Sequence, residues 1–211
     1  MTSTQPLVSC IMPTRGRHAF ANEAIAAFKD QSWDNKELIV VDDSEKYFNV
    51  SAHQVRSQRI PFQCTVGLKR NIACELATGK YIMHWDDDDI YSFERIETQI
   101  NRLIAAEQKG KFISGYHSMQ FVTESGHRWL YSGPPHTVVG VSLCYNKEVW
   151  KSHPFPCLNI GEDTAFTMAL GYAVQSHPDD GRILARIHGG NTSQKTQEYL
   201  ESHPVNWRRV A

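Results

Sequence analysis

Four consecutive aspartates at 86–89 are the residues of this sequence best suited to chemistry. They directly follow the apolar run 81–85, and Trp85 and Ile90 flank them. Adjacent carboxylates repel one another unless a cation is present, and hard divalent ions prefer oxygen ligands. A solvated acidic turn is the alternative, but a run that ends a buried strand lies where open α/β sheets bind their ligands. The pattern therefore favours a metal site.

Two further sets of charged residues follow presumed strands. Asp42 and Asp43 end the run ELIVV, where a carboxylate can accept hydrogen bonds from a base or a ribose; capping of the next segment explains the pair equally well. Arg15, Lys69 and Arg70 come just after other presumed strands, so we expect them at the same edge. Cations beside a metal suit a diphosphate, although surface solvation would explain any one of them alone.

The late part of the chain supplies a candidate base and a candidate ligand. Glu162 and Asp163 follow Gly161 at the start of a predicted helix, where acidic residues also stabilise the helix N-terminus. Near a metal, one of these carboxylates can act as a general base. His188 precedes two glycines in a late loop, from which an imidazole can reach a metal. Ten histidines in the chain make this single one weak evidence.

Alternating strands and helices must position these residues. Apolar runs predict buried strands at 7–12 and 37–41 on either side of a helix at 19–31, and this βαβ order implies a parallel sheet. The alternation continues with a strand at 62–66, a helix at 68–77 ended by Gly79, a strand at 81–85 and a helix at 92–107.

Beyond Lys111 the pattern changes to short, aromatic-rich pieces, with a strand expected at 138–145 and a helix at 161–170. We expect this half to be an extension packed on the same sheet and not a second domain. The predicted fold class is therefore α/β: a doubly wound, mostly parallel open sheet with helices on both faces, in a single domain over 1–211.

Composition narrows the classes of function. The chain has 22 Lys plus Arg and 23 Asp plus Glu, a net charge of −1, which argues against a general polyanion-binding protein. Five cysteines form no CxxC pair, so reduced thiols in a cytoplasmic protein are the simpler interpretation. We expect neither a signal peptide nor an integral membrane segment. The absence of GxGxxG after the first strand and of GxxxxGK[ST] disfavours a dinucleotide-binding Rossmann enzyme and a P-loop protein.

Five blocks of the sequence, taken in order, resemble glycosyltransferase family 2, a group of nucleotide-sugar transferases with the GT-A fold. The blocks span residues 7 to about 193 and read VSCIMPTRGR, ELIVVDDS, GLKRNIACELATGKYIMHWDDDD, GVSLCYNKEVW…FPCLNIGEDTAF and RIHGGNTS. The resemblance implies a metal-dependent inverting glycosyltransferase using Mn²⁺ or Mg²⁺. It would move a sugar from a nucleoside diphosphate sugar to an acceptor hydroxyl by single displacement. A UDP-sugar is expected because uridine diphosphate is the family's commonest nucleotide.

Carried over position by position, the resemblance implies metal binding by three residues. Asp86 and Asp88 match the two ends of the family's DxD motif, and His188 matches a late histidine that contacts the metal or the diphosphate in some members. Glu162 and Asp163 match the ED motif, whose aspartate is usually the catalytic base.

The resemblance assigns nucleotide-sugar binding to a larger set at the ends of the first strands. It leaves open which member of the doubled pair Asp42 and Asp43 contacts the base, and it gives Asp89 the place of a frequent additional aspartate. The whole set is Pro13, Thr14, Arg15, Asp42, Asp43, Lys69, Arg70, Asn71, Asp86 and Asp87.

Within this interpretation, 1–110 is the nucleotide-sugar-binding half, 111–193 the acceptor and catalytic half, and 194–211 a C-terminal tail. The aromatic-rich segment suggests acceptor contacts by Tyr116, His117, Trp129 and Tyr131, because aromatic rings stack on sugars and bases, although packing against the sheet is their default role. The acceptor class stays open between a glycan, a lipid-linked glycan, a protein, a small molecule and a modified nucleic-acid base. The sequence is compatible with a homo-oligomer.

A non-catalytic nucleotide-sugar-binding or scaffold domain is the alternative from another class, since any enzyme fold can lose its activity. The complete set of DxD, ED and late histidine argues against that alternative.

Overall fold

Two β-sheets form the framework of the computed structural model, which describes residues 5–193 and 195–210. At the centre of the larger sheet, β1 (Val8–Thr14) lies between β2 (Lys36–Asp42) and β5 (Tyr81–His84), and all three run parallel. Their carboxyl ends therefore meet at one edge of the sheet, where open α/β sheets bind ligands. The acidic run at 86–89 begins two residues after β5 ends, so it lies at this edge.

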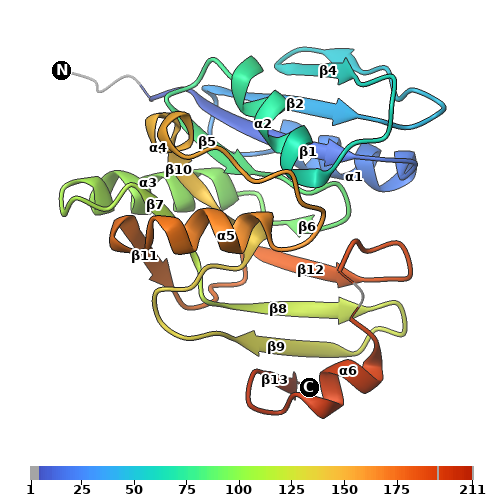
Figure 1. The fold of residues 1–211 in the computed structure, drawn as a ribbon, viewed down its shortest axis with the longest axis vertical. Helices are drawn as coiled ribbons and strands as arrows, with labels where there is room; N and C mark the ends of the chain where they lie inside the picture. The colour runs from blue at the N-terminus through green and yellow to red at the C-terminus, as the bar shows by residue number, and fades with distance from the viewer. Residues whose placement is uncertain (1–4, 194, 211) are drawn as a thin grey trace.

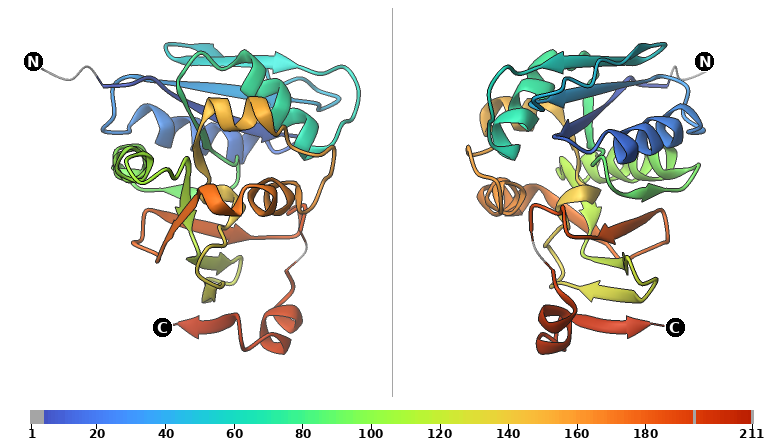
Figure 2. Two further views of the ribbon diagram at one scale, coloured as in Figure 1. Left: turned by 60° about the vertical axis from the view of Figure 1, so that its left-hand side comes forward. Right: turned by 90° about the vertical axis from the view of Figure 1, so that its right-hand side faces the viewer.

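Helices cover both faces of the larger sheet because its central strands are apolar on both sides (Figures 1 and 2). Phe28 and Ile96 bring α1 and α3 into one apolar cluster, whereas Ala73 and Phe166 bring α2 and α5 into the cluster on the opposite face. The helices are α1 (His18–Lys29), α2 (Val66–Leu76), α3 (Arg95–Glu107), α4 (Lys147–Ser152) and α5 (Glu162–Ala169). The predicted doubly wound α/β arrangement is confirmed.

The outer strands of the larger sheet make it mixed rather than purely parallel. Its order is β11-β7-β10-β5-β1-β2-β4-β3, and β10 runs antiparallel to both β5 and β7. These strands are β3 (Ser51–Ala52), β4 (Val55–Arg59), β7 (Ile113–Tyr116), β10 (Cys144–Asn146) and β11 (Val174–His177).

A second sheet, in the order β13-β9-β8-β12-β6, lies beside the carboxyl edge of the first (Figure 1). The late half thus adds β7, β10 and β11 to the first sheet, and its other strands form the second sheet together with β6. Near the C-terminus, α6 (Gln197–Ser202) precedes β13, which pairs antiparallel with β9. The strands are β6 (Ile90–Tyr91), β8 (Ser118–Thr123), β9 (Arg128–Ser132), β12 (Ile183–Ile187) and β13 (Trp207–Val210).

Three predicted details are wrong for identifiable reasons. Residues 62–66 form no strand, because the place beside β2 belongs to the polar β4, whose only buried residue is Val55. Gly79 is not the C-cap of α2, since the helix ends at Leu76; a Cβ on Gly79 would lie 2.6 Å from Ser9 Oγ, so close packing requires this glycine. The strand predicted at 138–145 shrinks to β10, because Gly140–Ser142 form a 3₁₀ turn.

All five cysteines are free thiols, as expected. Among the described residues, every helix is too short or too polar to span a bilayer.

Candidate functional site

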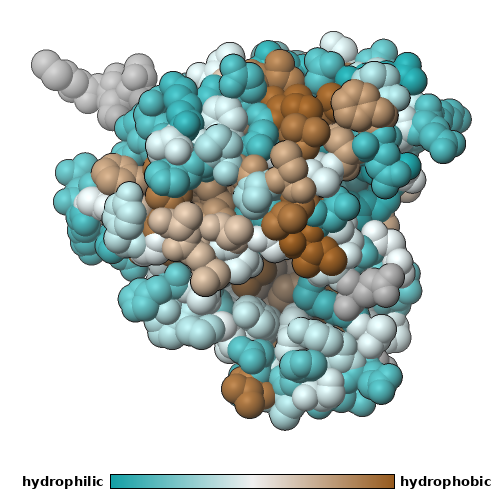
Figure 3. Space-filling model, in the orientation of Figure 1, coloured by the Kyte–Doolittle hydropathy of each residue, from teal (hydrophilic) through white to brown (hydrophobic). Residues whose placement is uncertain are grey.

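A pocket of about 960 Å³ opens at the carboxyl edge of β1 and β5 and is walled by residues of both sheets. The space-filling view shows the hollow below α5 (Figure 3). Half of the site residues predicted from the sequence line this pocket, together with Asp89. They are Pro13, Arg15, Lys69, Arg70, Asp86, Asp88, Tyr131, Glu162 and Asp163.

The remaining predicted residues lie outside this lining. Some support it from behind: Asn71, for example, accepts hydrogen bonds from the Trp150 indole at 2.8 Å and from the Phe155 amide at 3.0 Å. Tyr116 and Trp129 are buried in the main apolar cluster, so they pack the fold. The full set is Thr14, Asp42, Asp43, Asn71, Asp87, Tyr116, His117, Trp129 and His188.

The doubled aspartates that end β2 have different surroundings. Asp42 is fully buried and accepts hydrogen bonds from the backbone amides of Ser44 at 3.0 Å and Phe48 at 2.7 Å, so it holds the following loop. Asp43 lies 2.8 Å from Lys69 Nζ and 3.6 Å from Arg15 NH1, and both cations line the pocket. Burial acts to raise the pKa of Asp43, but the hydrogen bonds from Lys69 and the Cys64 amide, together with the charges of Lys69 and Arg15, lower it. Asp43 is therefore the member of the pair that adjoins the pocket wall.

The aspartates at 86 and 87 point to different cations. Asp86 lines the pocket and pairs with Arg70, with 3.1 Å between Oδ1 and NH1. Asp87 is buried against Arg17 NH2 at 2.6 Å and accepts a hydrogen bond from Thr14 Oγ1 at 2.5 Å. Burial raises the pKa of Asp87 to about 7, although the adjacent Arg17 opposes the shift.

The aspartates at 88 and 89 connect the acidic turn to the late part of the chain. Asp88 Oδ2 lies 2.6 Å from Arg17 NH1, 3.0 Å from His188 Nε2 and 3.1 Å from Asn191 Nδ2. Asp89 accepts a hydrogen bond from the Arg186 amide at 3.0 Å, and burial raises its pKa well above the usual range. Residues 186–191 thus bring His188 to the acidic turn.

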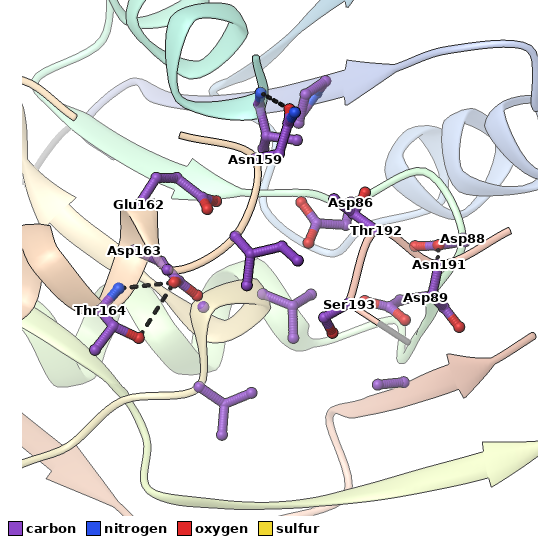
Figure 4. Close-up of a pocket in the computed structure, with 18 of the residues that line it drawn as sticks. Asp86, Asp88, Asp89, Asn159, Glu162, Asp163, Thr164, Asn191, Thr192 and Ser193 are labelled. Atoms are coloured by element: carbon purple, nitrogen blue, oxygen red, sulfur yellow. Dashed lines mark hydrogen bonds between the residues drawn. The ribbon is translucent and has the colours of Figure 1, made fainter. Parts of the chain in front are cut away.

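Glu162 and Asp163 begin α5 on the opposite side of the pocket from the acidic turn (Figure 4). Glu162 Oε1 lies 3.1 Å from Arg70 Nε, so the buried Arg70 joins α2, α5 and Asp86. Burial raises the pKa of Glu162, and the Arg70 charge opposes that rise.

Asp163 is only half-buried, and its contacts differ from those of Glu162. Its Oδ1 accepts a hydrogen bond from the Thr164 amide at 2.7 Å. Its Oδ2 lies over Gly140, where an added Cβ would be only 1.7 Å away. Because Gly140 has no side chain, the Asp163 carboxylate can occupy this position, where it faces the pocket.

Comparison with known proteins decides the family. Residues 9–156, most of the chain, match Glycosyl transferase family 2. The chain belongs to this family. Among its relatives, an uncharacterized glycosyltransferase of Haemophilus influenzae is 31% identical over 107 residues, covering 47% of this chain and 43% of the relative.

Solved structures of low identity share the fold. TarS 1-349 of S. aureus, in complex with UDP-GlcNAc, is 20% identical with a TM-score of 0.67, covering 94% of this chain and 64% of that one. The mannosyltransferase PcManGT of Pyrobaculum calidifontis, in complex with GDP-Man and Mn²⁺, is 14% identical with a TM-score of 0.67, covering 90% and 59%. The GT-A fold is thus confirmed. The chain spans less than two thirds of the length of each of these proteins.

In this family 2 protein, sequence reasoning missed several residues of the pocket. Arg17 stands two positions beyond Arg15 in the same loop, so the second cation of the run RGR was an available signal. Lys195 lines the pocket after the late loop. Burial lowers the pKa of Lys195, although Asp89 and Asp163 act in the opposite direction. No spacing in the sequence indicates that Lys195 returns to this site.

The donor atoms present fit a divalent ion held partly by substrate. Asp88 Oδ2 and His188 Nε2 converge, whereas Asp86 is held by Arg70. Within 5–193 and 195–210, no three His, Cys, Asp or Glu side chains are grouped to hold a metal ion. Because Mg²⁺ is commonly bound by one or two protein carboxylates with phosphates and water, two protein ligands suffice for an ion that also binds a diphosphate.

Proposed function

We propose that this protein is a metal-dependent inverting glycosyltransferase that moves a sugar from a nucleoside diphosphate sugar to an acceptor hydroxyl. The observation that carries the proposal is one pocket with a half-buried carboxylate, Asp163, on one side and the acidic turn with its cations on the other. A single displacement needs these two functions together: a base for the acceptor and neutralisation of the leaving diphosphate.

The nucleotide is assigned to the end of the pocket near β1 and β2. Arg15 and Lys69 line that end, and the buried Asp43 behind them pairs with both cations. We propose a UDP-sugar, because TarS, which matches 94% of this chain, was solved with UDP-GlcNAc. A GDP-sugar is the competing donor, since PcManGT was solved with GDP-Man.

Asp88 and His188 are the residues proposed to hold Mn²⁺ or Mg²⁺, with phosphate oxygens and water as the other ligands. When bound, the ion supplies positive charge that stabilises the departing diphosphate. Asp86, paired with Arg70, is proposed to face the sugar and ribose of the donor.

Asp163 is proposed as the general base that takes the proton of the acceptor hydroxyl. Glu162 is a poor candidate, because Arg70 holds its carboxylate in a buried ion pair. Attack from the Asp163 side, opposite the leaving diphosphate, inverts the anomeric centre.

The far end of the pocket is proposed for the acceptor. Tyr131, one of the four predicted acceptor residues, lines it together with Phe121, Tyr199 and Trp207. Aromatic rings of this kind offer flat apolar surfaces against which a sugar ring can pack.

Two substitutions separate the proposed roles. Asp163→Asn is expected to retain donor binding and to lose about 10²–10⁴-fold in turnover, the usual contribution of a general base. Asp88→Ala is expected to lose metal-dependent donor binding. Donor binding is measured by calorimetry and turnover by release of the nucleoside diphosphate. Wild-type turnover by Asp163→Asn would show that the base assignment is wrong. Donor binding without turnover in the wild type would favour the alternative of a non-catalytic binding domain.

A further inference from the structure

The guanidinium of Arg17 contacts two adjacent carboxylates of the acidic turn at once. Its Nε lies 3.2 Å from Asp87 Oδ2 and its NH2 lies 2.6 Å from Asp87 Oδ1, which makes a two-pronged contact. Its NH1 lies 2.6 Å from Asp88 Oδ2 and 3.3 Å from the Gly190 carbonyl oxygen. Arg17 therefore shares its single positive charge between the two carboxylates.

The two ends of this contact differ in their surroundings. The Asp87 side chain is 0% exposed, is held further by Thr14 and lies outside the pocket lining. Asp88 lines the pocket, and so does Arg17 itself. Two-pronged pairs between arginine and carboxylate are geometrically specific. Nε and NH2 thus form a fixed anchor on Asp87, while NH1 is an arm that reaches the carboxylate facing the pocket.

A divalent ion and the NH1 arm compete for the same atom. Asp88 Oδ2 contacts Arg17, His188 and Asn191. A second cation at that oxygen would meet the guanidinium charge at close range, where like charges repel strongly. An ion that binds Asp88 through Oδ2 therefore requires NH1 to leave.

We propose that Arg17 is the resident counter-cation of Asp88 and that it couples metal binding to donor binding. The inference rests on the proposed function. Without donor, NH1 stays on Asp88 and divalent ions bind weakly. A diphosphate entering the pocket offers oxygens that a guanidinium fits well. NH1 then moves to the diphosphate oxygens while Nε and NH2 stay on Asp87, and Asp88 becomes free for the ion.

The test measures Mn²⁺ binding, from the electron paramagnetic resonance signal of free Mn²⁺, with and without UDP or GDP. Arg17→Gln is compared with Arg186→Gln, a matched control. Arg186 lines the same pocket and its side chain is 24% exposed, against 23% for Arg17, but it pairs with Glu23 at 2.8 Å.

Arg17→Gln is expected to bind Mn²⁺ alone about tenfold more tightly than wild type, the equivalent of one charge-assisted hydrogen bond. Arg186→Gln is expected to match the wild type. The nucleotide that binds is expected to tighten Mn²⁺ binding more in wild type than in Arg17→Gln. Arg17→Lys keeps the charge and the fold but loses the two-pronged contact, so we expect Mn²⁺ affinity between those of wild type and Arg17→Gln. This variant decides the question if Arg17→Gln does not fold.

Two results separate the failure of this inference from the failure of the proposed function. Equal Mn²⁺ affinities in wild type and in the folded Arg17 variants, without nucleotide, would overturn the role of Arg17. Lack of UDP and GDP binding by the wild type would instead overturn the donor site on which the coupling depends.

Discussion

Replacing Gly140 by alanine moves the proposed base without changing its chemistry. The added methyl group would lie 1.7 Å from Asp163 Oδ2, well inside van der Waals contact. Gly140 does not have a positive φ, so alanine can adopt its backbone conformation. The carboxylate of Asp163 is the flexible group that must give way.

The Gly140→Ala substitution is expected to have two separate effects, one on stability and one on the reaction rate. Turning the Asp163 side chain away from its preferred rotamer costs about 1 kcal/mol, which corresponds to a decrease in Tm of about 2–4 °C for a chain of this size. A base displaced by roughly 1 Å costs about 10²-fold in rate. Gly140→Ala is therefore expected to lose about 10²-fold in kcat while keeping its fold and its donor affinity.

Gly171→Ala is the matched control, because Gly171 also lines the pocket and a Cβ there would meet nothing within 4 Å. Release of nucleoside diphosphate from the donor, with water or a glycan as acceptor, measures the rate, and calorimetry measures donor binding. If Gly140→Ala and Gly171→Ala turn over equally fast, the position of Asp163 over Gly140 does not matter and the reasoning fails.

Two further predictions concern stability. Arg70→Gln leaves Glu162 and Asp86 without their buried cation, so denaturant unfolding is expected to show a loss of about 3–5 kcal/mol; a loss below about 1 kcal/mol would contradict the importance of this network. Burial acts to raise the pKa of Glu37, but hydrogen bonds from Ser9 and Thr78 lower it below 4.5. The charged form therefore stabilises the fold above that pH, and the benefit disappears as the pH falls through the folded pKa. Glu37→Gln is expected to be less stable than wild type by about 1 kcal/mol near neutral pH, and the gap in urea unfolding is expected to close as the pH falls through the lowered pKa of Glu37; a gap independent of pH would contradict this.

The first half of the fold could be predicted because its elements have strong local patterns. The run ELIVV is buried on both faces in β2, and the apolar spacing around Phe28 gives α1 its buried face. The acidic run was correctly expected at the edge of the sheet, since it directly follows β5. A segment that is buried along its whole length can be recognised from its apolar residues.

The rest depends on contacts between distant segments. In β4, next to the short edge strand β3, Arg56, Gln58 and Arg59 are exposed, so no apolar pattern marks the strand. The second sheet pairs β12 with β8 and β13 with β9. These strands are far apart in the sequence, so no local residue spacing indicates that they pair. For the same reason, a place for His188 near the metal or the diphosphate was expected from the family resemblance rather than from sequence spacing.

Calorimetric titration of the wild-type protein with UDP and with GDP, in Mn²⁺ and again in EDTA, tests the central claim most directly. We expect one nucleotide to bind in Mn²⁺ and its affinity to fall by at least about tenfold in EDTA, a change of about 1.4 kcal/mol. The difference is expected to vanish in Asp88→Ala. Binding that is equally tight with and without metal, or no binding of either nucleotide, would contradict a metal-assisted donor site at the acidic turn.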